Sequence, residues 1–394
     1  MKDFLQEAKA MSEQLTAFRH DLHQHPEVGM DLPRTTRKIE EVLRRAEIPF
    51  TNPIPSSVLV VLRGGRPGKT LLLRADMDAL PMQEDSGVDY ASLEAGKMHA
   101  CGHDMHATML LGAALLLKKH LADLPGTVKL VWQPGEEIFA GMKPLVEAGM
   151  LENPAVDAAF DMHVDVTAPV GSVMYSSGAL TTAATNFSID IKGAGGHGAF
   201  PHTTTDPVNV AVQIYQAIQA MQTREVSPAD YLALSICCLQ AGDTYNIIPH
   251  TASLMGTMRS YDKKVHERAL SRIREIVANT AATFHAKTRM ELAVNVPAIV
   301  NNPDMAKAMA AYLEAFPMDL HIQDDARISA SDDFGFVSEK VPSLMLMTGC
   351  KPEGIGANNF HNPHVVMDDQ ALPVGTALWC HLAFCWLRDQ ESAS

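Results

Sequence analysis

The stretch Lys69-Thr70-Leu71-Leu72-Leu73-Arg74-Ala75 predicts a strand within an alternation of helices and strands. Before it lie helices over 4–22 and 34–46, a strand over 57–63 and a turn over 64–68. After it come a helix over 104–120, a strand over 127–132, a helix over 142–148 and a strand over 157–162. Such alternation is typical of a largely parallel sheet covered by helices.

The pattern changes near residue 180. Strands over 186–192, 231–239, 252–258 and 289–296 and helices over 206–221 and 263–284 predict a smaller α+β unit. A helix over 303–315 begins the last segment, whose strand over 343–347 would rejoin the first sheet. Since 394 residues exceed what one core usually serves, we expect an α/β protein of two domains. Residues 1–180 and 296–394 would form a discontinuous domain with a mixed, mostly parallel sheet, and residues 181–295 an inserted α+β sandwich.

The composition argues against several classes of partner. The formal net charge is −14, so neither nucleic acid nor an anionic membrane surface suits this protein. No apolar run reaches the length of a membrane span, and the first 15 residues lack the apolar region of a secretion signal. The six cysteines resemble no disulfide framework, which predicts reduced thiols in a cytoplasm.

A cluster of potential ligands lies in the segment Met98-His99-Ala100-Cys101-Gly102-His103-Asp104-Met105-His106. It holds a thiol, three imidazoles and a carboxylate at the start of a predicted helix. Thiolate and imidazole are strong ligands of zinc-like cations, and glycine lets the backbone bend so that Cys101 and His103 converge. A lone histidine is more often structural, so this cluster alone leaves both interpretations open.

A pair of glutamates, Glu136 and Glu137, follows the strand over 127–132, at a position where α/β sheets place their ligands. Adjacent side chains point in different directions, so one carboxylate can bind a metal while the other carries a proton. The alternative is a solvated helix start, where glutamates favour the helix dipole. For an isolated pair that alternative is the commoner case.

Other polar residues also follow strands or lie in loops. Asp76 and Asp78 come directly after the strand over 69–75, on the same side of it, and could orient a ligand histidine. His163 ends the strand over 157–162, and His361 lies in a polar loop near the C-terminus. Each histidine taken alone is more often structural than catalytic.

Together these motifs resemble the M20 metallopeptidase family in its amidohydrolase branch. That branch includes aminoacylases, hippurate hydrolases, indole-acetyl-amino-acid hydrolases and N-acetyl-diaminopimelate deacetylases. The resemblance runs through residues 23–27, 74–81, 99–106, 133–137, 193–202, 246–249 and 256–259. It implies a hydrolase of linear amides that deacylates N-acyl amino acids, by a metal-activated hydroxide with a glutamate as general base.

The resemblance implies two divalent cations per chain, Zn²⁺ or Mn²⁺, with Co²⁺ or Ni²⁺ possible. Their ligands would be Cys101, His103, Glu137, His163 and His361. The Cys101 thiolate would touch both ions, with Glu137 and His361 on one ion and His103 and His163 on the other. His364 is the alternative to His361, because the final loop matches the family loosely. Glu136 would be the general base, and Asp78 would complete the catalytic set.

The inserted domain resembles the family's lid and dimerisation domain, which predicts a homodimer or homotetramer. His197 would donate to the oxyanion, within the chain or across a dimer interface. Asn246 and Arg259 would hold the substrate carboxylate, and His202 would line the pocket. A nucleotide-binding loop at residues 195–198 is the weaker idea, because the G-x-G-x-x-G spacing is missing.

Alternatives to this function remain within and outside enzymes. Dipeptidase, carboxypeptidase-like or N-carbamoyl hydrolysis could use the same scaffold. A catalytically inactive dimeric scaffold protein is the alternative from another class. Hydrolysis that is lost on chelation and restored by metal would separate an enzyme from a scaffold.

Overall fold

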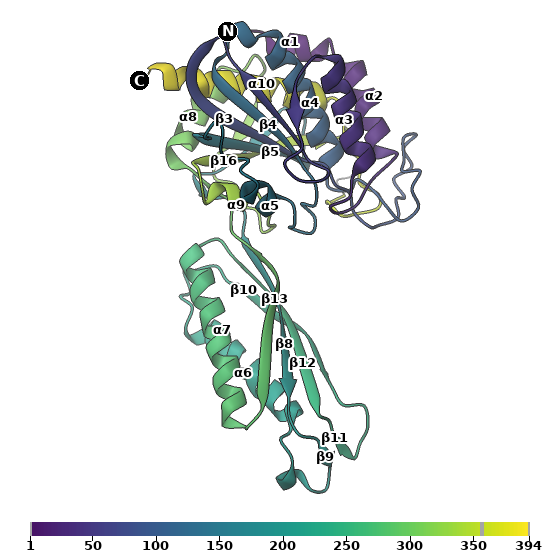
Figure 1. Cartoon of the computed structure of the whole chain (residues 1–394), viewed down its shortest axis with the longest axis vertical. Helices are drawn as coiled ribbons and strands as arrows, with labels where there is room; N and C mark the ends of the chain where they lie inside the picture. The colour runs from purple at the N-terminus through teal and green to yellow at the C-terminus, as the bar shows by residue number, and fades with distance from the viewer. Residues whose placement is uncertain (1, 355–357, 393–394) are drawn as a thin grey trace. The chain divides into compact units, whose positions relative to one another are not determined.

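The computed structural model describes residues 2–354 and 358–392. The chain divides into two compact units. The larger unit comprises Met1–Leu180, Val300–Arg327 and Asp332–Ser394, and the inserted unit comprises Thr181–Ile299 and Ile328–Ser331. Figure 1 labels the elements of both units.

The larger unit is built on an eight-stranded sheet in the order β1-β2-β4-β3-β5-β16-β6-β15. Its strands are β1 (Phe50–Thr51), β2 (Val58–Arg63), β3 (Arg66–Asp76), β4 (Pro125–Gln133), β5 (Ala158–Pro169), β6 (Ser172–Met174), β15 (His321–Gln323) and β16 (Ser343–Lys351). The central strands β4, β3, β5 and β16 run parallel, with Leu73 opposite both Leu130 and Phe160. The carboxyl ends of β3 and β4 therefore meet at one edge, where α/β sheets bind their ligands.

Helices pack against this sheet. They are α1 (Phe4–Lys9), α2 (Ser12–His23), α3 (Pro33–Arg45), α4 (His103–Lys119), α5 (Met142–Glu147), α8 (Pro303–Glu314), α9 (Gly335–Ser338) and α10 (Ala371–Ser392). A short pair, β7 (Gly178–Ala179) and β14 (Val300–Asn301), and a 3-10 turn at Leu121–Asp123 complete the unit. Helices α4 and α10 contact each other and both pack on β3 and β4 (Figure 1). They are apolar on nearly every side, as expected of helices enclosed by other elements.

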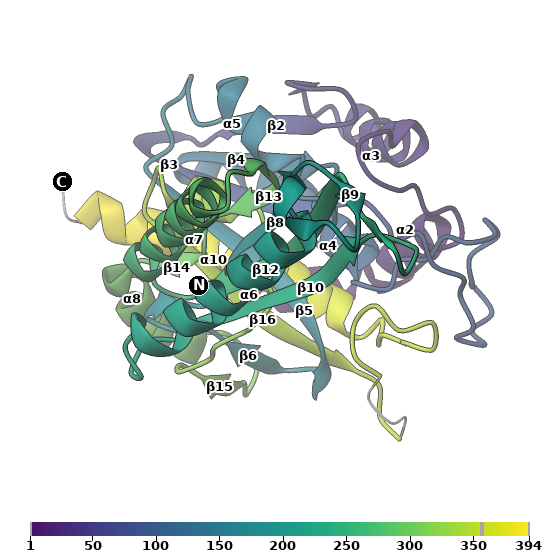
Figure 2. The same cartoon turned by 90° about the horizontal axis from the view of Figure 1, so that it is seen from below.

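The inserted unit is a four-stranded antiparallel sheet with two helices. Its elements are β8 (Ala183–Lys192), β9 (Gly196–His197), a 3-10 turn (Pro201–Thr203), α6 (Pro207–Arg224), β10 (Ala233–Ala241), β11 (Ile247–Ile248), β12 (Thr251–Ser260), α7 (Lys263–Thr283) and β13 (Lys287–Val296). The sheet order is β10-β12-β8-β13, and β9 pairs with β11 apart from it. Helices α6 and α7 lie side by side against the sheet (Figures 1 and 2), where Ile214 and Ile273 pack with Ile189 and Leu254.

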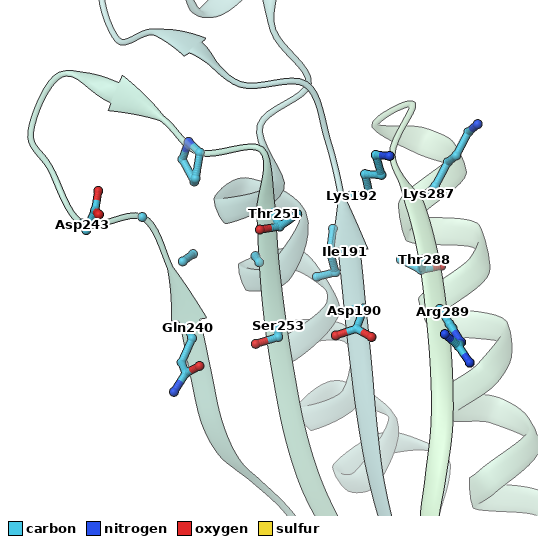
Figure 3. A pocket seen from close by; sticks show the side chains of 14 residues that line it. Asp190, Ile191, Lys192, Gln240, Asp243, Thr251, Ser253, Lys287, Thr288 and Arg289 are labelled. Atoms are coloured by element: carbon cyan, nitrogen blue, oxygen red, sulfur yellow. The ribbon is translucent and has the colours of Figure 1, made fainter.

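The alternation of side chains along β8 explains how this sheet buries one face. Ile189 and Ile191 are buried, whereas Asp190 and Lys192 are exposed. Figure 3 shows a pocket over the ends of β8, β10, β12 and β13, with the helices behind the sheet in this view. Its lining contains no histidine, cysteine or glutamate, so this pocket lacks the groups for which the sequence predicts metal binding and proton transfer.

The α/β fold class is confirmed, and the predicted elements recur with shifted ends. The helix predicted over 4–22 is instead two helices, α1 and α2. The Ser12 hydroxyl donates to the Lys9 carbonyl at 2.8 Å, and such side-chain bonds to the backbone compete with helix continuation. Within the described part of the chain, none of the helices combines the length and apolarity needed to cross a membrane.

Candidate metal centre

The backbone brings a thiol and an imidazole together at the start of α4. Cys101 precedes this helix by two positions, and His103 is its first residue. Gly102 between them has a φ of +89°, and a Cβ there would lie 2.4 Å from Cγ2 of Val164. Only glycine tolerates both the left-handed conformation and the close approach, so Gly102 is required for this arrangement.

Two overlapping groups of potential ligands share the Cys101 thiol. The ligand atoms of Cys101, His103 and His163 lie within 4.8 Å of one another, and so do those of Cys101, Glu137 and His361. These are the five residues to which the sequence assigns metals, and they come from four separate segments. A thiolate shared by two sets of nitrogen and oxygen donors can serve two cations.

Three donor atoms of this cluster lack a hydrogen-bond partner. Both ring nitrogens of His103 and Oε1 of Glu137 are buried without a hydrogen-bond partner among the described residues. An unpaired buried polar atom costs about 1–3 kcal/mol, so several of them in one place point to a ligand. Nitrogen, oxygen and sulfur donors in this combination fit zinc-like divalent cations.

Hydrogen bonds orient two histidines beside the cluster. His163 Nδ1 donates to the Val164 carbonyl at 2.7 Å, and His163 Nε2 lies 3.6 Å from Cys101 Sγ. His106 uses both ring nitrogens, because Nδ1 donates to Asp76 at 2.6 Å and Nε2 accepts the Val164 N–H at 2.9 Å. His163 is therefore turned to bind a metal through Nε2, whereas His106 fixes the strand that carries His163.

Glu136 and Glu137 lie between β4 and α5, in residues 134–141, here called the glutamate loop. Asp78 accepts hydrogen bonds from the backbone N–H groups of Glu136 at 3.0 Å and Glu137 at 3.2 Å. Its Oδ1 also lies 3.4 Å from His103 Nδ1. The Glu136 carboxylate lies 3.8 Å from His103 Nε2. Asp78 thus faces both the loop and a candidate ligand histidine.

The surroundings of Glu136, His103 and His361 favour protonation of these three groups. Burial, with Asp332 nearby, raises the pKa of Glu136 well above its usual range. Burial disfavours the charged form of His103, yet the Asp76 carboxylate and the Cys101 thiol raise its pKa well above the usual value. Hydrogen bonds to Cys101 and Glu137 raise the pKa of His361 to about 10. Divalent cations would compete with the protons of His103 and His361 for these two imidazoles.

The final loop presents His361, and not His364, to the cluster. The His361 N–H donates to the Ala100 carbonyl at 3.0 Å, and His361 Nε2 lies 3.4 Å from Glu137 Oε2. The φ of His361 is +59°, which non-glycine residues adopt mainly at constrained sites. His364 Nδ1 instead donates to the Asp85 carbonyl at 2.5 Å, and His364 joins no ligand group within residues 2–354 and 358–392.

A buried ion cluster adjoins the glutamate loop, and sequence reasoning missed three of its members, Asp161, Asp332 and Asp333. Arg74 Nη1 lies 2.8 Å from Asp76 and 3.3 Å from Asp161, and Arg74 Nη2 lies 3.1 Å from Asp332 and 3.3 Å from Asp333. No side chain of the five is more than 7% exposed. Arg74 and Asp332 are 258 residues apart, so no local motif could reveal the cluster.

The other four predicted residues belong to the inserted unit. His197 pairs with Ile247 between β9 and β11, and the Asn246 carbonyl accepts the Gly198 N–H at 2.8 Å. His202 lies in the 3-10 turn that follows β9. Arg259 is near the far end of β12, roughly 26 Å along the strand from its first residue at about 3.3 Å per residue. Within one chain, Asn246 and Arg259 therefore lie at different ends of the sheet.

Comparisons with known proteins agree with the predicted family. Residues 72–384 match the model of peptidase family M20/M25/M40. N-acetylcysteine deacetylase of Bacillus subtilis (strain 168) is 32% identical over 378 residues, which cover 95% of this chain and 97% of that protein. Thermostable carboxypeptidase 2 of Saccharolobus solfataricus is 32% identical over 383 residues, 96% of each chain.

A solved structure matches over nearly the whole length. The crystal structure of a Bacillus subtilis protein, a dinuclear metal binding peptidase from the M20 family, matches this chain with a TM-score of 0.83 and 30% sequence identity. The match covers 96% of this chain and 99% of that chain. The family resemblance inferred from the sequence is confirmed, and the chain belongs to peptidase family M20/M25/M40.

Proposed function

We propose that this protein is a metal-dependent amidohydrolase that releases an amino acid from an N-acyl amino acid. The observation that carries the proposal is the position of Glu136. Its buried carboxylate adjoins the candidate ligand Glu137, and Asp78 holds the backbone of both. The names of the relatives support the substrate class, because a deacetylase of N-acetylcysteine and a carboxypeptidase both cleave an amide bond of an amino acid.

We assign two divalent cations to the centre, with Cys101 as a ligand of both. Glu137 and His361 complete one ligand set, and His103 and His163 complete the other. Zn²⁺ and Mn²⁺ are the first choices, and Co²⁺ and Ni²⁺ suit the same donors. Bound there, the cations would supply the Lewis acidity that activates water and polarises an amide carbonyl.

Glu136 is the proton carrier in this proposal. Its carboxylate takes a proton from the attacking water and, once protonated, gives it to the leaving nitrogen. Asp78 contributes by keeping the backbone of Glu136 and the ring of His103 in a fixed relation.

We propose that residues 1–180 and 296–394 form the catalytic domain and that residues 181–295 act as lid and dimerisation domain. His197 would donate to the oxyanion, and His202 would line the pocket. Asn246 and Arg259 would both bind the substrate carboxylate. Because these two lie at different ends of the sheet, they would meet one substrate from two chains of a homodimer or homotetramer.

The role of Cys101 also bears on the cellular compartment. Only a reduced thiol can form the thiolate that binds metal, and the six cysteines are unpaired in the structure. A reducing cytoplasm is the compartment that keeps such a thiol available.

Hydrolysis by protein that is stripped with a chelator and reloaded with Zn²⁺, Mn²⁺, Co²⁺ or Ni²⁺ tests the proposal. The substrates are N-acetyl, N-benzoyl and N-indole-acetyl amino acids, dipeptides and N-carbamoyl amino acids, and released amine is measured. We expect turnover of N-acyl amino acids that disappears with chelation and returns with metal. Faster turnover of dipeptides or N-carbamoyl amino acids would favour those alternatives, and no turnover by metal-loaded protein would favour an inactive scaffold.

A further inference from the structure

One buried carboxylate joins the two ends of the glutamate loop. Gln133 is the last residue of β4, and its Nε2 donates to Asp333 Oδ1 at 2.6 Å. Met142 is the first residue of α5, and its backbone N–H donates to Asp333 Oδ2 at 2.9 Å. The residue before the loop and the residue after it are therefore bound to the same side chain.

The partner of Asp333 at the strand end is itself fixed. Arg74 Nε donates to Gln133 Oε1 at 2.8 Å, which orients the Gln133 amide so that its NH₂ group points to Asp333. Asp78 meanwhile holds the middle of the loop through the N–H groups of Glu136 and Glu137. The loop is thus held at its base and at its tip by carboxylates from two different segments.

Asp333 is an unfavourable choice for stability alone. Its side chain is fully buried, and burial together with the Asp332 carboxylate raises its pKa to about 7 against the opposing charge of Arg74. A neutral residue would avoid this cost. A carboxylate, however, accepts a hydrogen bond on each oxygen, whereas an amide of the same size offers one acceptor and one donor group. Only the carboxylate can hold both ends of the loop.

We propose that Asp333 is a positioning residue that anchors the glutamate loop and so sets the place of Glu136. An Asp333 oxygen lies within 4.8 Å of a Glu136 carboxylate oxygen, but the hydrogen bonds from Asp333 to this part of the chain go to Gln133 and Met142 and not to Glu136. The effect on turnover rests on the proposed function, whereas the anchoring of the loop does not. A displacement of about 1 Å in the position of a catalytic group such as the Glu136 carboxylate lowers the rate by up to about 10²-fold.

The test compares Asp333→Asn with Asp161→Asn. Asparagine at 333 keeps the volume and one acceptor but cannot accept from both Gln133 and Met142. Asp161 is as deeply buried and also contacts Arg74, at 3.3 Å, but it makes no hydrogen bond to the glutamate loop or to its ends. Both variants therefore lose a carboxylate beside Arg74, and only one of them releases the loop.

Two readouts separate anchoring from general stability. In hydrogen–deuterium exchange of metal-free protein, Asp333→Asn should speed exchange of residues 135–141 by about ten-fold or more, and Asp161→Asn should not. In metal-loaded protein, Asp333→Asn should lower kcat by about ten-fold or more with little change in KM, while Asp161→Asn keeps at least about half of kcat.

The exchange rate of residues 135–141 and the kcat of Asp333→Asn decide whether Asp333 anchors the glutamate loop. Unchanged exchange of residues 135–141 together with a normal kcat in Asp333→Asn would overturn it. If wild-type protein hydrolyses no substrate, the proposed function fails and the exchange experiment alone judges the anchor. If Asp333→Asn does not fold, Gln133→Met removes the strand-end contact and should raise loop exchange in the same direction. A Gln133→Met protein with wild-type exchange would equally overturn the anchor.

Discussion

The two units of the chain differ in what they bury. Among the described residues, the larger unit encloses charged side chains, namely Arg19, Arg74, Asp76, Asp78, Glu84, Asp104, Lys129, Glu136, Asp161, Asp165, Asp332 and Asp333. The buried polar residues described in the inserted unit are Thr181, Thr182, Thr185, Ser260 and His266, none of which is an aspartate, glutamate, lysine or arginine. Buried charge costs free energy unless it is paired.

This difference separates the parts of the molecule by role. The inserted unit keeps a conventional apolar core under two helices, so its interior contributes stability and shape. Part of the buried charge of the larger unit lies beside His103 and the glutamate loop, where a charge can move a proton or hold a cation. Perturbed ionisable groups gather at functional sites for this reason.

The largest effect of a substitution is expected at Glu136, one of the buried charged residues of the larger unit. Glu136→Gln should lower kcat by about 10²–10⁴-fold, because only the proton carrier is removed. Metal content should stay at the wild-type value, measured by elemental analysis of the same samples. Glu147→Gln is the matched control on the neighbouring helix α5, with a side chain that is 66% exposed, and it should behave as wild type. A Glu136→Gln enzyme with normal turnover would refute the proton-carrier role.

The next largest effect is expected for the buried ion cluster. Arg74→Met should lower the free energy of unfolding by about 3–5 kcal/mol, because it leaves four buried aspartates without their shared cation. Denaturant unfolding measures this loss. Arg45→Met removes an exposed arginine with a weak contact to Glu41, and should change stability by less than about 0.5 kcal/mol. Equal losses in the two variants would mean that the buried cluster is not held by Arg74.

The smallest effect is expected in the inserted unit, where His266 is the one buried ionisable group described. Its ring nitrogens contact Thr185 Oγ1 at 2.7 Å and Ser260 Oγ at 2.9 Å. Burial, with Arg259 nearby, lowers the pKa of His266 to about 4. The unfolded chain therefore binds a proton at higher pH than the folded one, and stability is lost as pH falls from about 6.5 towards 4.

Urea unfolding of the inserted unit, followed by hydrogen exchange in α6 and α7, measures this dependence. Between about pH 7.5 and about pH 5.5 the loss should be about 1 kcal/mol. His266→Asn should remove it, and the exposed control His285→Asn should retain it. The assignment to His266 fails if both variants keep the wild-type dependence.

Much of the fold, and the residues of the candidate ligand groups, could be predicted because both are encoded in short segments. The alternation of strands and helices marks the parallel sheet, and Cys101, His103 and Glu137 stand in local motifs that are rich in donors. Helix α10 carried no such signal. Its apolar residues surround the whole helix, so no amphipathic period distinguishes it from other apolar sequence.

The missed site residues share a different cause. Asp332 and Asp333 lie in a polar segment that reads as solvated, and only the fold brings them to Arg74 and Gln133. The sequence likewise did not show that Asn246 and Arg259 lie at different ends of the inserted sheet. Both residues stand in recognisable motifs, but a motif does not reveal how far it lies in space from the next motif along the chain.

Anomalous diffraction from crystals of the zinc-loaded protein tests most directly whether the Cys101 thiolate binds two cations. We expect two zinc peaks per chain, both about 2.3 Å from Cys101 Sγ. One peak should contact His103 and His163, and the other Glu137 and His361. A single peak, or two peaks that leave the Cys101 sulfur unbound, would show that Cys101 does not bind two cations.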